Sequence, residues 1–165
     1  MLIGNPDTFA IWFDSVPMWN DTATFDNGLL VLWVNGDYYP KEIATATLRR
    51  EIPLLAQKLA HLPVEAALYH LPAKEAFRQM YERTFPDDWT VDNDYRFDVT
   101  PDALADNGCF IFAVSNGEAV RILADVLSYQ AEEGQHDLYA SQPSETVLPL
   151  AEIDDILATL AQVYT

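Results

Sequence analysis

Residues 109–123 read CFIFAVSNGEAVRIL, two apolar runs of strand length separated by an Asn-Gly pair at 116–117. The runs are rich in β-branched and aromatic side chains, and Asn-Gly favours the positive φ angles of a tight hairpin turn. The stretch therefore predicts a β-hairpin, with one strand at 109–115 and the other at 118–123.

A second set of paired strands is predicted near the start of the chain. Residues 9–13 and 28–34 are short apolar runs bounded by Asn, Asp and Gly. An Asn-Gly pair at 35–36 suits a type I′ turn, which places a short return strand at 38–39. Residues 14–27, between the two apolar runs, are expected to form a loop with aromatic anchors.

Apolar residues recur at steps of three and four in three other segments, as on the buried face of an amphipathic helix. The expected helices cover residues 44–61, 73–83 and 150–164. Pro53 falls inside the first helix, so we expect it to split or kink the helix. The alternative is a short first turn followed by a helix that starts near Ile52 with proline in its first turn. Thr45 or Thr47 is available as an N-cap.

The remaining segments predict smaller elements. We expect an edge strand at 95–99, a helical turn at 101–105, a polar loop around 132–135 and a weak strand at 146–148. Strands first, helices between, strands again and a terminal helix indicate an α+β fold. We expect a single domain over residues 1–165, with a mainly antiparallel sheet, two central helices and a C-terminal helix.

The chain combines strong negative charge with enough apolar mass to fold. It has nine Lys and Arg against 26 Asp and Glu, a net charge of −17, and half of its residues are hydrophobic. That apolar content excludes a disordered chain. Because phosphate neutralisation needs clustered basic side chains, and an anionic surface repels this chain, we expect neither nucleic acid nor membrane as a partner.

The compartment is indicated by cysteine usage and by the first residues. The single cysteine, Cys109, cannot form an intrachain disulfide and fits a reducing compartment. Residues 1–7 lack the basic and apolar regions of a secretory signal, and the apolar run at 29–34 is too short to span a membrane. We therefore expect a cytoplasmic protein.

The acidic surplus is concentrated outside the two central helices. Residues 1–40, 41–86 and 87–165 carry net charges of −5, +2 and −14. Seven acids lie within residues 87–106, interleaved with two aromatic residues. The candidate partner-binding residues are Asp87, Asp88, Trp89, Asp92, Asp94, Tyr95, Asp98, Asp102 and Asp106.

This segment has two interpretations. It is either a solvated surface, with Trp89 and Tyr95 packing the loop onto the core, or a docking surface for a basic protein. Clustered like charge destabilises a compact fold unless a partner compensates it, and Trp and Tyr are enriched at interface hot spots. The first loop offers a second acidic patch, which consists of Asp14, Trp19, Asp21 and Asp26.

Patterns of catalytic or metal sites are absent from the sequence. A calcium loop on the Asp92-x-Asp94 spacing would have Phe97 at its turn glycine, and the three histidines and Cys109 lack zinc-ligand spacing. There is no Gly-x-Ser-x-Gly elbow and no Gly-rich phosphate loop. We therefore expect no catalytic residue, no metal and no cofactor.

Two alternatives to a protein-docking function stay open at this point. One is a small ligand-binding domain or enzyme with a carboxylate, such as Asp14 or Asp98, in a pocket between sheet and helices. The other is an acidic scaffold or chaperone that dimerises through an apolar helix face.

Three stretches of the chain form a recognisable pattern. They are Ile3–Asp7 before Phe9–Phe13, Gly28–Pro40, and Gly108–Ala113 with its Asn-Gly hairpin. The pattern resembles the bacterial immunity proteins that neutralise polymorphic toxins, most closely immunity protein family 42. The resemblance implies a small cytoplasmic α+β protein that binds a cognate toxin domain, as in contact-dependent growth inhibition systems.

The charge of the chain adds an expectation about that toxin. An acidic inhibitor presents carboxylates where a basic nuclease expects phosphates. We therefore expect a basic toxin domain, with a nuclease as one candidate activity, and an immunity protein that is a monomer or a heterodimer with its toxin.

Overall fold

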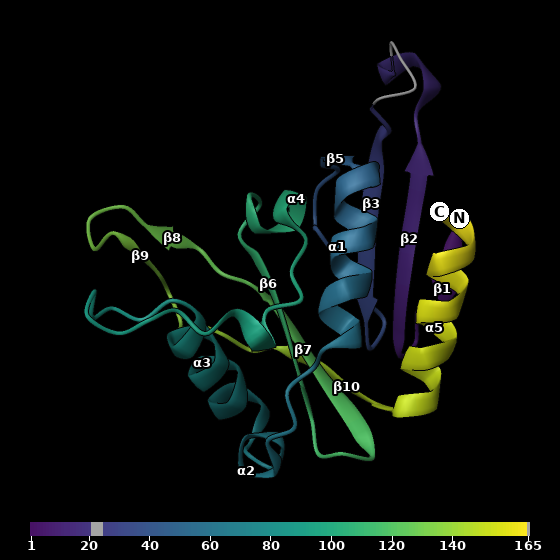
Figure 1. The fold of residues 1–165 in the computed structure, drawn as a ribbon. Helices are drawn as coiled ribbons and strands as arrows, with labels where there is room; N and C mark the ends of the chain where they lie inside the picture. Colours follow the sequence, from purple (N-terminus) through teal and green to yellow (C-terminus); the bar gives the residue numbers. More distant parts are fainter. Residues whose placement is uncertain (21–24, 165) are drawn as a thin grey trace.

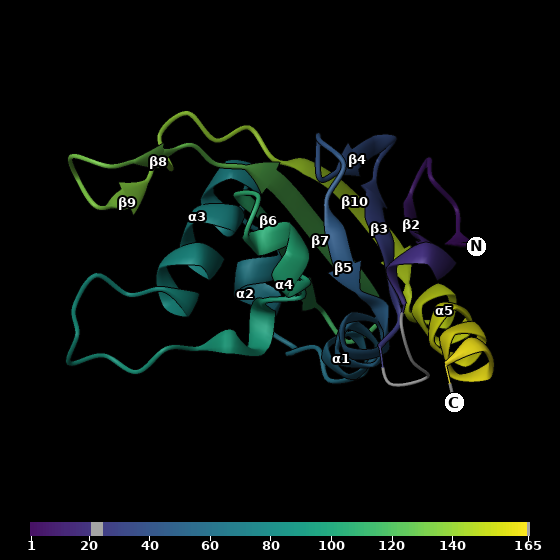
Figure 2. The same ribbon diagram turned by 90° about the horizontal axis from the view of Figure 1, so that it is seen from above.

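A computed structural model describes residues 1–20 and 25–164 (Figures 1 and 2). Its strands form two antiparallel sheets and a short ribbon. The N-terminal sheet runs β1 (Leu2–Gly4), β2 (Phe9–Ser15), β3 (Asn27–Val34) and β4 (Asp37–Tyr39), with β5 (Thr45–Thr47) also paired to β3. The C-terminal sheet runs β10 (Ser144–Pro149), β7 (Ala119–Val126) and β6 (Cys109–Ser115), and the ribbon pairs β8 (Tyr129–Gln130) with β9 (Gln135–His136).

The helices fall into two groups around these sheets. They are α1 (Leu48–Ala60), α2 (Ala66–Tyr69), α3 (Ala73–Thr84), α4 (Asp102–Ala105) and α5 (Leu150–Val163), with 3₁₀ turns η1 (Pro17–Trp19) and η2 (Tyr95–Phe97). Helices α1 and α5 contact each other and strands of the N-terminal sheet, whereas α2 and α3 contact the C-terminal sheet (Figure 2). The predicted α+β class, with antiparallel pairing, two central helices and a C-terminal helix, is confirmed, but the strands form separate sheets instead of the single sheet expected.

Strand β6 of the C-terminal sheet is buried on both faces, which explains its almost unbroken apolar sequence. Along β6, Cys109, Ile111 and Ala113 belong to the core shared with the N-terminal sheet, α1 and α5. The alternate residues Phe110 and Phe112 belong to a second core with α2 and α3. Burial also raises the pKa of the Cys109 thiol to about 11.

Both predicted hairpins are present. Asn35 and Gly36 have φ angles of 52° and 81°, as a type I′ turn requires, and they connect β3 to the return strand β4. The turn of the β6–β7 hairpin is longer than two residues, because Ser115 pairs with Val120, and Gly117 takes a φ of 98° within it.

Tyr39 joins the two sheets. Its side chain is buried, and its hydroxyl group lies 3.0 Å from the Ala124 carbonyl of β7 and 3.1 Å from Ser144 Oγ of β10. The return strand that the Asn-Gly turn creates therefore ends against the C-terminal sheet.

The first helix differs from its prediction at its start. It begins at Leu48 because residues 45–47 pair with residues 27–29 of β3 instead of joining the helix. Thr47 is the N-cap residue, but its hydroxyl group hydrogen-bonds Asn27 Oδ1 at 3.2 Å and caps nothing. The Leu48 N–H donates to the Asp26 carbonyl at 2.7 Å instead.

Pro53 does not divide this helix, and the helix does not start at Ile52. Helix α1 is continuous from Leu48 to Ala60 with Pro53 inside it. Proline at this position removes only the hydrogen bond to the Arg49 carbonyl, and the buried face that includes Leu55 holds both halves against the core.

One further prediction is wrong. Residues 95–99 do not form a strand: they begin with the 3₁₀ turn η2, whose Arg96 N–H donates to the Asp94 carboxylate at 3.2 Å, and only Asp98 makes a bridge, to Phe112 of β6. The polar loop expected around 132–135 is confirmed: residues 131–134 form the turn that connects β8 to β9, and Gln135 begins β9.

Candidate functional site

The segment between α3 and η2 projects from the body of the molecule, at the end away from α5 (Figures 1 and 2). We call residues 87–95 the acidic loop. Asp87, Asp88 and Asp92 are exposed on it, and Trp89 exposes 92% of its surface. Four of the predicted partner-binding residues therefore lie together on one accessible segment.

The base of the acidic loop is closed by hydrogen bonds to the end of α3. The Asp94 N–H donates to the Arg83 carbonyl at 2.8 Å, and the Asn93 amide donates to the Thr84 carbonyl at 2.8 Å. The Thr84 hydroxyl group donates back to the Asp94 carbonyl at 3.2 Å. These contacts hold the two ends of the loop together while its tip stays in solvent.

Two of the predicted carboxylates are neutralised beside this base. Asp94 pairs with Arg96 at 2.7 Å, and hydrogen bonds from Arg96 lower the pKa of Asp94. The Asp98 side chain is only 15% exposed, lies 3.7 Å from Lys58 Nζ and accepts the Thr100 N–H at 2.9 Å. Both carboxylates stabilise the fold around η2.

The last two predicted residues lie on a different part of the surface. Asp102 starts α4 and pairs with Arg50 of α1 at 2.6 Å, and Asp106 is the exposed C-cap of α4. Helix α4 contacts β5 and β6. The structure therefore separates the nine candidates into the acidic loop with its base and the α4 surface.

The exposed acids of the loop carry uncompensated charge. Within residues 1–20 and 25–164, Asp87, Asp88 and Asp92 take part in no ion pair. Asp88 Oδ1 accepts the N–H and the hydroxyl hydrogen of Thr90, which lowers the pKa of Asp88. All three carboxylates are exposed and available to a partner.

The two aromatic residues of the loop differ in how far they pack. Tyr95 is 58% exposed, and its ring centroid lies 6.3 Å from that of Phe85. Trp89 enters no aromatic pair in the part of the chain that the structure describes. The interpretation that Trp89 packs the loop onto the core is therefore wrong.

A cavity of about 400 Å³, absent from our sequence predictions, lies between the start of the acidic loop and the β8–β9 ribbon. We call it the aromatic cleft. It is lined by Tyr81, Glu82, Phe85, Pro86, Asp87, Phe110, Tyr129, Gly134, Gln135, His136 and Leu138. The polar residues around Gly134 indicated a turn in the sequence, but no local pattern indicates that this ribbon lies against Tyr81 of α3 and Phe110 of β6.

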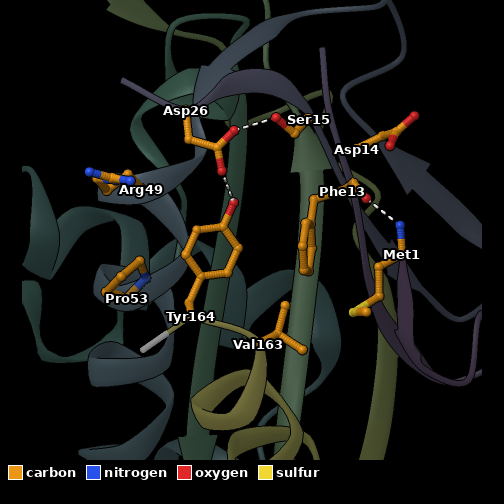
Figure 3. A pocket seen from close by; sticks show the side chains of 9 residues that line it. All are labelled: Met1, Phe13, Asp14, Ser15, Asp26, Arg49, Pro53, Val163 and Tyr164. Carbon is orange, nitrogen blue, oxygen red and sulfur yellow. Dashed lines mark hydrogen bonds between the residues drawn. The ribbon is translucent and has the colours of Figure 1, made fainter. Parts of the chain in front are cut away.

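The second acidic patch borders a cavity of about 670 Å³ between the N-terminal sheet and the end of α5 (Figure 3). Asp26 accepts hydrogen bonds there from Ser15 Oγ and, at 2.6 Å, from the Tyr164 hydroxyl group. Burial and the Asp26 contact raise the pKa of Tyr164. Asp14 and Arg49 complete the charged lining, while the predicted Asp21 lies outside the described residues.

An apolar surface lies on the outer side of the N-terminal sheet. A hollow of about 340 Å³ there is lined by Leu2, Pro6, Trp12, Val31, Trp33 and Tyr38. The Trp33 and Tyr38 ring centroids are 5.4 Å apart. We call this surface the outer aromatic face, and it carries no acidic side chain.

In residues 1–20 and 25–164, no three His, Cys, Asp or Glu side chains are grouped so that they could hold a metal ion. Over the same ranges, every helix is too short or too polar to cross a membrane.

The family model for immunity protein 42 matches residues 1–163, almost the whole chain. The chain is a member of the immunity protein 42 family. The family resemblance read from the sequence is thereby confirmed. No curated protein matches the chain.

A solved structure agrees with this family assignment. The crystal structure of CdiI from Burkholderia dolosa AUO158 is similar to this immunity protein with a TM-score of 0.80 and 27% sequence identity, over 99% of each chain. The protein is therefore a toxin-neutralising immunity protein and not an enzyme. The family assignment also argues against the alternative of a small enzyme with a carboxylate in a pocket between sheet and helices.

Proposed function

We propose that this immunity protein neutralises a basic toxin domain by docking it on the acidic loop. Basic side chains of the toxin pair with Asp87, Asp88 and Asp92. Trp89 is the central contact of the interface, and Tyr95 lies at its edge. The paired carboxylates Asp94, Asp98 and Asp102 hold the structure beside the loop, and the exposed Asp106 adds to the negative field that steers the toxin.

One observation carries this proposal: a tryptophan that is 92% exposed stands among uncompensated carboxylates. Burial of a tryptophan side chain is favourable, and Trp89 does not gain this free energy in the isolated protein. Its position therefore favours burial against a partner. The surrounding acids supply the polar rim that interface hot spots carry.

The toxin activity that fits this surface best is that of a nuclease. A nuclease presents basic side chains to phosphates, and carboxylates arrayed on a loop can pair with the same side chains. We place the encounter in the cytoplasm, where the monomeric immunity protein and the toxin domain form a heterodimer.

Charge reversal on the loop tests the proposal. The variant Asp87→Lys with Asp92→Lys should bind the toxin domain encoded beside the immunity gene with an association rate lowered about tenfold or more at low salt. The measurement is biolayer interferometry with a catalytically inactive toxin, at about 50 and 300 mM NaCl, because screening shortens the reach of these charges.

The matched control is Asp154→Lys with Asp155→Lys, which makes the same change in net charge on exposed positions of α5. This control should lower the association rate by less than about threefold. Equal effects of the two double variants would show that only net charge matters, and no effect of either would remove the acidic loop from the interface.

A further inference from the structure

We infer that the aromatic cleft receives one lysine or arginine side chain of the toxin. The inference rests on the proposed function, since the cleft opens beside the acidic loop and shares Asp87 with it. The acidic loop acts through its charge, whereas the cleft is a recess that accepts a single kind of side chain.

The walls of the cleft are aromatic. Ring centroids lie 5.1 Å apart for Tyr81 and Phe110, 4.9 Å for Phe110 and His136, and 5.3 Å for Tyr129 and His136. Phe85 extends the cluster, 5.1 Å from Tyr81. Aromatic faces are the negative ends of the ring quadrupole and attract a cation that lies over them within about 6 Å.

The charged groups around the cleft are negative. Glu82 and Asp87 line it, and no lysine or arginine lies among its lining residues. Glu82 forms an ion pair with Arg78 at 2.8 Å, whereas Asp87 has no ion-pair partner within the described part of the chain. Burial lowers the pKa of His136, so its ring is neutral at pH 7 and adds no cation.

A long basic side chain matches this lining better than an apolar one. Its methylene stem packs on the rings while its head pairs with Asp87. An apolar side chain would cover Asp87 and the polar atoms of Tyr81 and His136 without replacing the water that they lose. An acidic side chain would add repulsion from Asp87 and Glu82.

The cleft is held open before any partner arrives. The Tyr81 hydroxyl oxygen lies 3.0 Å from His136 Nδ1, which ties the ribbon to α3. The Asp137 N–H donates to the Ser128 carbonyl at 2.9 Å and closes the base of the ribbon, and Lys74 Nζ donates to the Tyr139 carbonyl at 2.7 Å. A recess that is already ordered costs less to fill than one that must form on binding.

The first test removes one wall of the cleft. Tyr129 is 60% exposed, so Tyr129→Ala should fold normally and speed dissociation of the inactive toxin domain about tenfold. The control is Tyr139→Ala, a 91% exposed tyrosine outside the cleft lining, which should change the dissociation rate less than about twofold.

The second test identifies the occupant. Each lysine and arginine of the toxin domain is replaced by alanine and measured with wild-type and Tyr129→Ala immunity protein. At one basic position, the alanine substitution should weaken binding to the wild-type protein but not to the Tyr129→Ala variant. The same substitution should show no such coupling to Trp89→Ala.

The outcomes separate this inference from the proposed function. If Tyr129→Ala leaves dissociation unchanged while charge reversal of the acidic loop slows association, the cleft inference is overturned and the docking proposal stands. Coupling of Tyr129 to an apolar or acidic toxin residue alone also overturns it. If neither set of variants affects binding, both fail together.

Discussion

At the scale of single residues, Trp89 links the exposed loop to toxin binding. It exposes 92% of its surface, so replacing it removes little from the fold. We expect Trp89→Ala to speed toxin dissociation about tenfold or more while changing the free energy of unfolding by less than about 1 kcal/mol. Interferometry and urea denaturation measure the two quantities. A large loss of stability with unchanged dissociation would assign Trp89 to the fold instead.

Glu51 predicts a pH dependence of stability. Its buried carboxylate accepts the Asp102 and Ala103 N–H groups at 2.9 and 3.2 Å, yet burial raises the pKa of Glu51 above its usual value of 4.5. The folded state therefore retains a proton that the unfolded state has lost, and the contribution of Glu51 to the free energy of unfolding falls as pH rises above about 4.5.

The variant Glu51→Gln has no such titration. Its free energy of unfolding, relative to the wild type, should rise between about pH 4.5 and pH 7. Urea denaturation of both proteins at several pH values gives this difference. A difference that stays constant with pH would show that the pKa of Glu51 is not raised in the folded protein.

At the scale of elements, the parts predicted correctly are those with local signals. The hairpin strands carry apolar runs and Asn-Gly turns, and the helices carry apolar residues at steps of three and four, so neither needs distant contacts to be recognised. The errors occur where distant pairing decides. Residues 45–47 pair with residues 27–29 of β3 instead of joining α1, and residues 95–97 form the 3₁₀ turn η2 against α3 instead of an edge strand.

Pro53 provides a test of what holds α1 together. The helix continues through it because one face is buried, so the proline weakens α1 without ending it. We expect Pro53→Ala to raise the free energy of unfolding by about 1–2 kcal/mol, since the new N–H can donate to the Arg49 carbonyl and unfolded-chain entropy offsets only part of the gain. Calorimetry measures the shift in Tm, and a lower Tm would contradict this explanation.

At the scale of the whole molecule, the sequence located the acidic surplus but not its distribution in space. Which carboxylates are neutralised depends on the fold, because Asp98 meets Lys58 and Asp102 meets Arg50 only after α1 packs. The aromatic cleft was missed for the same reason, since its walls come from α3, β6 and the ribbon. The cluster of acids around Trp89 is the part of the site that the sequence indicates, whereas the exposure of Trp89 is known only from the fold.

The most direct test of the central claim is hydrogen–deuterium exchange of the immunity protein, free and bound to its inactive toxin domain. Docking on the acidic loop and the aromatic cleft predicts slower exchange in residues 86–95 and 128–138 of the complex, with little change in α5. Slower exchange confined to the cavity of Figure 3, or to the outer aromatic face on β2 and β3, would contradict the claim.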